Sequence, residues 1–315
     1  MIGFDIGGTK CAVCIGKENE NGILILDKKV LSTDFTVSPY EMIDRMYSAA
    51  KSMTDKIDVI GISCGGPLSS EKGVIMSPPN LKGWDNIEIV KYLKDKYGVT
   101  ACLENDANAC AIAEWKFGAG RGCRNIIFMT FGTGLGAGLI LDGKLYRGAS
   151  DMAGEAGHIR LSQFGPVGYG KAGSFEGFCS GNGIAQLGVS YATEKFQKGE
   201  KVSFCKDFSD LSNITTKTIA EYANLGNEDA KEIFKICGRM LGEGLSVLID
   251  ILNPERIVLG SVFQRCEHLI REDMEKILEE ECLAYSLRVC NIVPAELKEN
   301  IGDYAALAVA IIKKE

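Results

Sequence analysis

One glycine-containing pattern occurs twice in the chain, and it constrains the fold more than any other feature. Residues 2–15 read as a strand, a turn at residues 7–8 and a returning strand. Residues 127–140 repeat this order, with their turn at residues 132–134. Two copies of one supersecondary unit predict two half-molecules of similar topology. Both hairpin turns would then line a cleft between the halves.

The first turn carries side chains suited to a phosphate. Asp5 precedes the glycines, and Thr9 and Lys10 follow them, which places a carboxylate, a hydroxyl and an ammonium near open backbone amides. A loop without bulky side chains admits a phosphate to such amides. Asp5 can also hold Mg²⁺ through water. The alternative is an ordinary hairpin, which would by itself explain the glycines.

A strand, short polar side chains and a helix meet within residues 100–117. The strand at 100–104 delivers Asn105 and Asp106, and the helix from Ala107 onward is apolar enough to bury most of its surface. We place the chemistry at this junction. The alternative is capping, because Asn and Asp commonly accept the free amides of a first helical turn.

Further polar side chains lie in glycine-rich segments. Glu155, His158 and Glu176 occur in one such stretch, which suits the recognition of several hydroxyls, although a lone histidine after glycine is more often structural. The loop at 73–84 contains Asn80 and reads either as a solvated connection or as a cleft wall. A strand at 256–261 ends in Gly260 and Ser261, where adenine could approach the backbone or where an ordinary strand-to-helix turn lies.

Composition excludes several classes of protein. The chain of 315 residues has a net charge of −7 and no basic run longer than Lys-Lys, which argues against nucleic acid as an obligatory partner. Its uncharged, largely apolar run at 126–141 is shorter than the ~20 residues of a membrane helix. No secretory leader follows Met1, so we expect a cytoplasmic protein without a membrane partner. The twelve cysteines are expected to be reduced and mostly buried.

Taken together, the motifs resemble those of the ROK family of sugar kinases and sugar-responsive repressors in order and spacing. The resemblance extends over essentially the whole chain. It implies an actin-like, ribonuclease H-like fold with two α/β domains around a central cleft, at residues 1–117 with the helix 303–315 and at 118–302. It also implies ATP, Mg²⁺ and a homodimer. The motifs are Asp5-x-Gly-Gly-Thr9, Asn105-Asp106-Ala-Asn108, Phe131-Gly-Thr-Gly134, Gly154-Glu-Ala-Gly-His158, and Glu176 with Ser180-Gly181.

The resemblance also implies a role for each matched residue. Asp106 resembles the general base of the family, and its place at a helix N-terminus is expected to keep it ionised. The implied sugar ligands are Asn80, Asn105, Glu155, His158 and Glu176. The implied nucleotide-binding residues are Asp5, Gly8, Thr9, Lys10, Gly132, Thr133, Gly134, Gly260 and Ser261, with Asp5 as the Mg²⁺ ligand through water.

One segment departs from the family pattern. Members commonly follow the histidine with Cys-x-Cys-Gly-x-x-Gly-Cys-x-Glu, whose thiolates and the histidine hold a structural zinc. Residues 168–176 read Gly-Tyr-Gly-Lys-Ala-Gly-Ser-Phe-Glu, without a thiolate and one residue short. His158 alone is not a tetrahedral zinc site. We therefore expect no zinc, and a loop held by backbone packing or by substrate.

The resemblance implies phosphoryl transfer from MgATP to a hexose, with glucose as the leading substrate. Fructose, allose, N-acetylmannosamine and N-acetylglucosamine stay open, because epimers differ by one hydroxyl contact. A non-catalytic sugar-sensing regulator is the rival from another class. Such repressors carry an N-terminal winged helix, whereas this sequence starts in the phosphate hairpin. A further rival is an ATPase switch of the actin or chaperone type, which would bind no sugar. The presence of Glu155, His158 and Glu176, which suit sugar hydroxyls, argues against it.

Overall fold

The computed structural model describes residues 1–19 and 22–312, and the chain divides into two compact units. Unit 1 comprises residues 1–128, 138–154 and those from 296 onward, and unit 2 comprises 129–137 and 155–295. The predicted domain boundaries at residues 117 and 302 stay a prediction.

Unit 1 is built on a five-stranded sheet with the order β3-β2-β1-β4-β7. β1 (Ile2–Ile6), β2 (Lys10–Asn19) and β3 (Gly22–Ser32) form an antiparallel meander, and β4 (Val59–Cys64) and β7 (Thr100–Asn105) continue the sheet parallel to β1. The carboxyl ends of β1, β4 and β7 therefore meet at one edge, which is the edge where open α/β sheets bind ligands.

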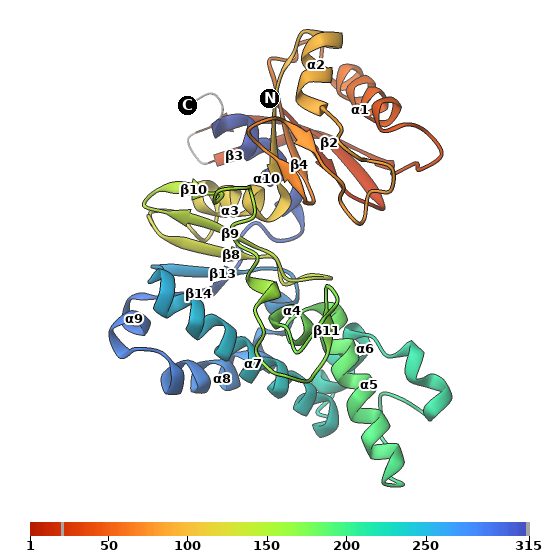
Figure 1. Ribbon diagram of the computed structural model, residues 1–315, viewed down its shortest axis with the longest axis vertical. Helices are drawn as coiled ribbons and strands as arrows, with labels where there is room; N and C mark the ends of the chain where they lie inside the picture. The colour runs from red at the N-terminus through yellow and green to blue at the C-terminus, as the bar shows by residue number, and fades with distance from the viewer. Residues whose placement is uncertain (20–21, 313–315) are drawn as a thin grey trace. The chain divides into compact units, whose positions relative to one another are not determined.

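Two helices cover one face of this sheet (Figure 1). α1 (Pro39–Met53) begins where Ser38 accepts a hydrogen bond from the Glu41 amide, and its buried stripe of Met42, Ile43 and Met46 joins the core. α2 (Ile89–Tyr97) adds further apolar side chains and ends at Gly98 in the left-handed conformation. The apolar periodicity of the sequence predicts helices at residues 39–56 and 87–97, and both helices lie close to these ranges.

The other face is covered by α10 (Ile301–Ile312). Side chains alternate along a strand, so Gly3 lies on the face opposite Phe4. A Cβ atom added at Gly3 would lie 2.9 Å from Cβ of Ala306, and one at Gly61 would lie 2.1 Å from the Ala306 backbone oxygen. The alanine-rich helix therefore packs with its backbone almost against the sheet, as the alanine content of residues 303–313 predicts. Residues 313–315 lie outside the described part of the chain.

The second sheet has the strand order β10-β9-β8-β13-β14. Its strands are β8 (Ile126–Met129), β9 (Ala137–Leu141), β10 (Lys144–Tyr146), β13 (Arg256–Leu259) and β14 (Asn291–Pro294). In both sheets, three consecutive strands appear in reverse order and two later strands follow. This shared order confirms the predicted repetition of one topology.

Apart from β13, β14 and shorter strands, unit 2 consists mainly of helices. α7 is long and begins at the cap Asn227, whose side chain accepts from the Ala230 amide, and it ends at Asn253 before a proline. The six-residue α9 was not expected, because it carries no periodic signal. The helices are α4 (Phe175–Phe178), α5 (Gly181–Gln197), α6 (Thr216–Asn224), α7 (Glu228–Leu252), α8 (Val262–Glu281) and α9 (Ala284–Val289).

Short elements complete the described chain. They include β5 (Leu68–Ser69), β6 (Val74–Ile75) and the 3₁₀ turns Ala156–His158, Phe208–Asn213 and Lys298–Asn300. All twelve cysteines are free thiols, and most are buried, as expected. Within residues 1–19 and 22–312, no helix is both long and apolar enough to cross a bilayer.

Candidate active site

The junction between β7 and α3 (Asp106–Phe117) lies at the carboxyl edge of the first sheet. Asn105 is the N-cap, and its Oδ1 accepts from the amides of Ala107 at 3.0 Å and Asn108 at 3.3 Å. The capping reading is therefore confirmed for Asn105. Oδ1 of Asp106 also accepts from the Ala107 amide, at 2.8 Å, while the Asp106 side chain stays accessible to solvent. Asp106 is thus held at the helix start with its carboxylate available to a ligand.

Asp5 and Asp106 repel each other electrostatically within unit 1. Burial, together with the nearby carboxylates of Asp106 and Asp303, raises the pKa of Asp5 to about 6. Desolvation by the surrounding protein also raises the pKa of Asp106, although its side chain still reaches solvent, and the hydrogen bond from the Ala107 amide acts in the opposite direction. The helix start was expected to keep Asp106 ionised, but burial determines the direction of its pKa.

The first glycine turn is tied to two other segments of unit 1. The Gly7 amide donates to the Lys10 oxygen at 3.1 Å, and Thr33 Oγ1 donates to the Gly7 oxygen at 2.6 Å. A Cβ atom at Gly8 would lie 2.3 Å from the backbone oxygen of Asn80, so only glycine permits this approach. The structure therefore brings the predicted phosphate turn and the predicted sugar ligand Asn80 together. Sequence reasoning did not find Thr33, which lies at a strand end far along the chain.

The chemistry of these groups is compatible with magnesium. No group of three or more His, Cys, Asp and Glu side chains able to hold a metal occurs in the described ranges. Mg²⁺, however, usually takes one or two carboxylates and completes its shell with water and substrate phosphates. The excess of negative charge that raises the Asp5 pKa is the condition that a divalent cation would relieve.

In unit 2 the second glycine turn meets the predicted adenosine loop. The Gly260 amide donates to the Met129 oxygen at 2.9 Å, which places residues 260–261 beside the turn at 132–134. The Gly181 amide, at the start of α5, donates to the Gly132 oxygen at 2.7 Å. Ser261 has a φ of 47°, an uncommon value for a residue other than glycine, and its amide donates to Gln264 Oε1 at 3.0 Å. The five predicted nucleotide residues of unit 2 are therefore neighbours.

The three predicted sugar ligands of unit 2 also lie close together. Oε2 of Glu176 accepts from the Leu135 amide at 2.9 Å, so this carboxylate is attached to the second glycine turn. A Cβ atom at Gly157 would lie 2.1 Å from the Leu135 oxygen and 3.3 Å from Glu176 Cβ, which brings the 155–158 turn against the same point. Glu155 and His158 themselves are exposed.

A small hairpin forms in the segment where the resemblance implies zinc ligands for the family but this sequence has none. β11 (Val167–Gly168) pairs with β12 (Lys171–Ala172), and Tyr169 and Gly170 between them have φ values of 43° and 74°. Positive φ at both central residues is the geometry of a type I′ turn. Gln186 holds one strand of this hairpin by two hydrogen bonds with the Val167 backbone, each of 2.9 Å.

The hairpin is also attached to the histidine turn. Lys171 Nζ donates to the His158 oxygen at 2.6 Å, and Arg160 Nη1 donates to the Ala172 oxygen at 2.6 Å. Backbone pairing and these side chains hold the loop in the described structure. The absence of zinc stays a prediction.

The structure distributes the sequence-predicted residues over both units. The predicted general base and part of each predicted ligand set belong to unit 1, and the remainder belong to unit 2. Unit 1 contains Asp5, Gly8, Thr9, Lys10, Asn80, Asn105 and Asp106, and unit 2 contains Gly132, Thr133, Gly134, Glu155, His158, Glu176, Gly260 and Ser261.

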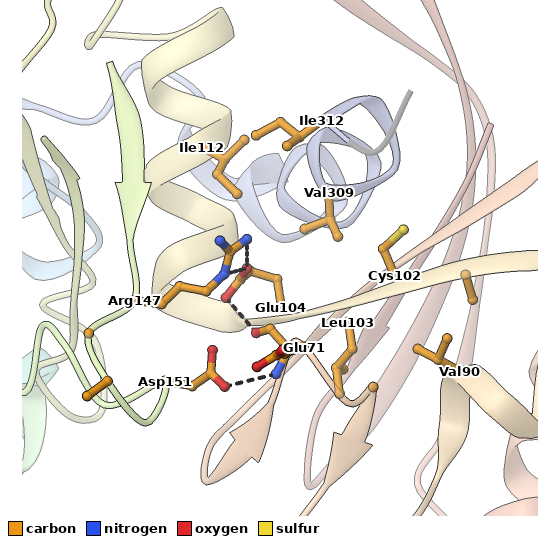
Figure 2. Close-up of a pocket in the computed structure, with 15 residues that line it drawn as sticks. Glu71, Val90, Cys102, Leu103, Glu104, Ile112, Arg147, Asp151, Val309 and Ile312 are labelled. Carbon is orange, nitrogen blue, oxygen red and sulfur yellow. Dashed lines mark hydrogen bonds and ion pairs between the residues drawn. The ribbon is translucent and has the colours of Figure 1, made fainter. Parts of the chain in front are cut away.

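One buried carboxylate next to the candidate base was not assigned a role from the sequence. Glu104 lies directly before Asn105 and is only 2% exposed. It pairs with Arg147 Nη2 at 2.7 Å, as Figure 2 shows. The sequence contains no signal that would relate residues so far apart.

Comparison with known proteins decides the family. The family model described as "ROK family" matches residues 1–313. The chain belongs to the ROK family. A glucokinase from Streptomyces coelicolor is 30% identical to it over 305 residues, which cover 96% of this chain and 94% of that relative. A xylose repressor from Caldicellulosiruptor bescii is 26% identical over 273 residues, which cover 86% of this chain and 67% of the repressor.

A solved structure agrees with this family assignment. The ROK family glucokinase from Streptomyces griseus in complex with glucose and AMPPNP is 28% identical to this ROK protein. It matches with a TM-score of 0.76 and covers 99% of each chain. The predicted actin-like ATPase fold of the α/β class is thereby confirmed.

Proposed function

We propose that this ROK protein is an ATP-dependent hexose kinase that transfers a phosphoryl group from MgATP to a sugar hydroxyl, with glucose as the first substrate to test. The single observation that carries the proposal is the edge of the first sheet. There β1 and β7 end on either side of β4, so that Asp5, the glycine turn at 7–8 and the pair Asn105 and Asp106 lie at the same edge, close enough for Asp106 to raise the pKa of Asp5. Its glucokinase relatives support a sugar kinase.

Asp106 is the proposed general base. Its carboxylate is fixed at the start of α3 by the Ala107 amide, and its raised pKa makes it a better proton acceptor than an ordinary aspartate. In the proposed reaction it accepts the proton of the attacking hydroxyl late in the step. Phosphoryl transfer needs alignment and charge neutralisation more than covalent help, so one base is sufficient.

The two glycine turns are the proposed phosphate sites. The backbone amides at 8–9 and at 133–134 donate no hydrogen bond within the described parts of the chain, and the exposed Thr9 and Lys10 add a hydroxyl and a positive charge. Asp5 would hold Mg²⁺ through water, and the ion would supply further neutralisation of phosphate charge. Gly260 and Ser261 would lie against the adenosine.

The proposed sugar ligands are amides, carboxylates and one imidazole, which together can donate to and accept from several hydroxyls. They are Asn80, Asn105, Glu155, His158 and Glu176. Kinases for fructose, allose, N-acetylmannosamine or N-acetylglucosamine use the same chemistry, and they are alternatives within this proposal.

A sugar-sensing regulator without catalysis is the second proposal, and the similarity to a xylose repressor is the observation that favours it. The same sugar-binding residues would serve it, but Asp106 would then have no proton to accept. The two proposals differ in one measurable product, because only the kinase would release ADP when sugar is added.

A panel of hexoses and N-acetylhexosamines with MgATP tests the function, scored by sugar-dependent ADP release. We expect one sugar to stimulate release well above the sugar-free rate, and glucose to be that sugar. Sugar binding by calorimetry without any stimulated ADP release would instead favour the regulator. ADP release that no sugar changes would favour an ATPase switch.

We further propose a cytoplasmic homodimer. Large apolar side chains are exposed on the end of α7 and on α9, including Ile251 at 72%, Leu283 at 67% and Tyr285 at 83%. α9 packs beside α7, and the Leu283 amide donates to the Asp250 carboxylate, so these residues belong to one surface. Exposed apolar groups of this kind are typical of protein–protein interfaces.

A further inference from the structure

The Glu104 carboxylate is the centre of a hydrogen-bond network in unit 1. Its Oε1 accepts from Ser70 Oγ at 3.1 Å, from the Asn105 amide at 3.0 Å and from Asn108 Nδ2 at 3.0 Å. Its Oε2 accepts from Arg147 Nε at 2.8 Å and pairs with Nη2 at 2.7 Å. Both oxygens of a buried charge are therefore fully engaged, and the guanidinium binds side-on with two nitrogens.

Two of these bonds reach the segment that carries the proposed base. The Asn105 amide immediately precedes Asp106, and Asn108 lies in the first turn of α3. Oδ1 of Asn108 is buried without a hydrogen-bond partner among the described residues. The Asn108 side chain is therefore oriented by the bond that its Nδ2 donates to Glu104. Glu104 thus fixes the strand end and the helix start on both sides of Asp106.

The other bonds reach the surface of unit 1. Arg147 lies just after β10, and its side chain is 40% exposed. Asp151 in the same loop accepts from the Ser70 amide at 3.2 Å through Oδ2. Arg147 and Glu104 line a cavity of about 550 Å³ that opens to solvent, shown in Figure 2. Small solutes can therefore reach the ion pair.

We propose that Glu104 and Arg147 are positioning residues: the Arg147 guanidinium holds the buried Glu104 carboxylate, and that carboxylate holds Asn105 and Asp106 in the geometry that phosphoryl transfer requires. The inference rests on the proposed function for its catalytic consequence, but not for its structural one. Small displacements of a catalytic group cost large factors in rate, of the order of 10²-fold for about 1 Å.

Arg147→Ala tests the catalytic consequence. We expect kcat per folded molecule to fall by ~10²-fold, while KM for ATP changes little, because Arg147 contacts no proposed nucleotide residue. Arg147→Lys should recover little, since an ammonium cannot replace two side-on donors. Arg45→Ala is the matched control: Arg45 also pairs with carboxylates in unit 1 and its side chain is 43% exposed, but it lies on α1.

Chemical rescue separates positioning from general damage to the fold. Ethylguanidinium, below denaturing concentrations, can enter the open cavity and replace the deleted group beside Glu104. We expect it to raise kcat of Arg147→Ala at least ~10-fold and to leave Arg45→Ala unchanged. Ethylammonium has the charge without the planar donors and should rescue weakly. Equal rescue by both cations, or none by either, would overturn the assigned geometry.

Hydrogen exchange tests the structural consequence without any activity. In Arg147→Ala and Glu104→Gln, amides within residues 100–110 should exchange faster than in the wild type, whereas those of α7 should not change. Unchanged protection at 100–110 in both variants would overturn the inference even in an active enzyme. If the variants exchange faster but the wild-type protein phosphorylates no sugar, the positioning role stays intact and only the proposed function is rejected.

Discussion

The backbone amide of Leu135 donates a hydrogen bond to Oε2 of Glu176 at 2.9 Å. A residue implied to bind sugar is therefore attached to a turn implied to bind phosphate. The attachment depends on Gly134, because a Cβ atom there would lie 2.7 Å from Glu176 Oε2. Changes at either position should consequently affect both substrates.

Gly134→Ala should raise KM for ATP and for the sugar together. The added methyl would displace the Glu176 carboxylate, and overpacking of about 1–3 kcal/mol corresponds to roughly 5- to 150-fold in affinity. Initial rates with each substrate varied in turn measure both constants. An increase confined to ATP would show that Glu176 does not connect the two sites.

Asp106→Asn should lower kcat by at least ~10²-fold while the protein remains folded. Asparagine keeps an oxygen that can accept from the Ala107 amide, so the helix start is preserved, but it cannot take a proton. Sugar-dependent ADP release gives the rate, and thermal unfolding by circular dichroism gives the control. Turnover close to that of the wild type would reject Asp106 as the base.

Asp5→Asn should stabilise the protein at neutral pH. The folded pKa of Asp5, about 6, lies above the ordinary aspartate value of 3.8, so between these values the folded state binds more protons than the unfolded state. The unfolding free energy of the wild type therefore falls as pH rises from about 4 to 6 and then levels off.

The substitution removes this loss, which amounts to at most about 3 kcal/mol at pH ~7 and approaches zero near pH ~4. Urea unfolding of both proteins, without nucleotide or divalent cations, measures the difference. A variant less stable than the wild type at neutral pH would contradict the burial of this charge.

Zinc removal should have no effect. The hairpin at 167–172 is held by backbone pairing and by Gln186, so phenanthroline should leave both the melting temperature and the rate unchanged. Elemental analysis should find much less than one zinc per chain. Gln186→Ala, by contrast, should loosen the hairpin and lower stability by about 1–2 kcal/mol, through loss of two hydrogen bonds. Stoichiometric zinc would reject the prediction.

Ile251→Asp should convert a dimer into a monomer. Ile251 is among the most exposed apolar side chains of α7, and a carboxylate at that position would be costly to bury in an interface. Analytical ultracentrifugation over a range of concentrations measures the change, and Leu225→Asp, an exposed position away from α9, is the control. A monomeric wild type would end the proposal of a homodimer on this surface.

Local signals in the sequence were sufficient for much of the fold. The glycine turns, the start of α3 after Asn105 and the stop of α7 at Asn253 each depend on a few adjacent residues with known backbone preferences. The close packing of α10 against a neighbour was also predictable from its alanine content, although the face of the sheet on which it packs was not.

Properties that depend on distant partners were not predictable in the same way. Nothing around Glu104 indicates that Arg147 is its partner, because the pairing is created by the loop after β10. The direction of the Asp106 pKa shift follows from burial, which exists only once the chain has folded, whereas the helix amide is visible in the sequence. The hairpin at 167–172 was not predicted for a different reason. In this segment the sequence departs from the family pattern, and the absence of the zinc ligands does not indicate which structure replaces them.

The close packing of α10 on Gly3 and Gly61 has a consequence during synthesis. The ribosome adds residues 301–312 long after those of β1 and β4, so the glycine face of the first sheet remains open to solvent while all of unit 2 is being translated. The face under α1 can close early, since its residues are neighbours in sequence. A nascent chain of this protein therefore exposes one face of its first sheet until the last helix is made. Such a surface can aggregate with other chains, and chaperones that bind nascent chains would prevent this.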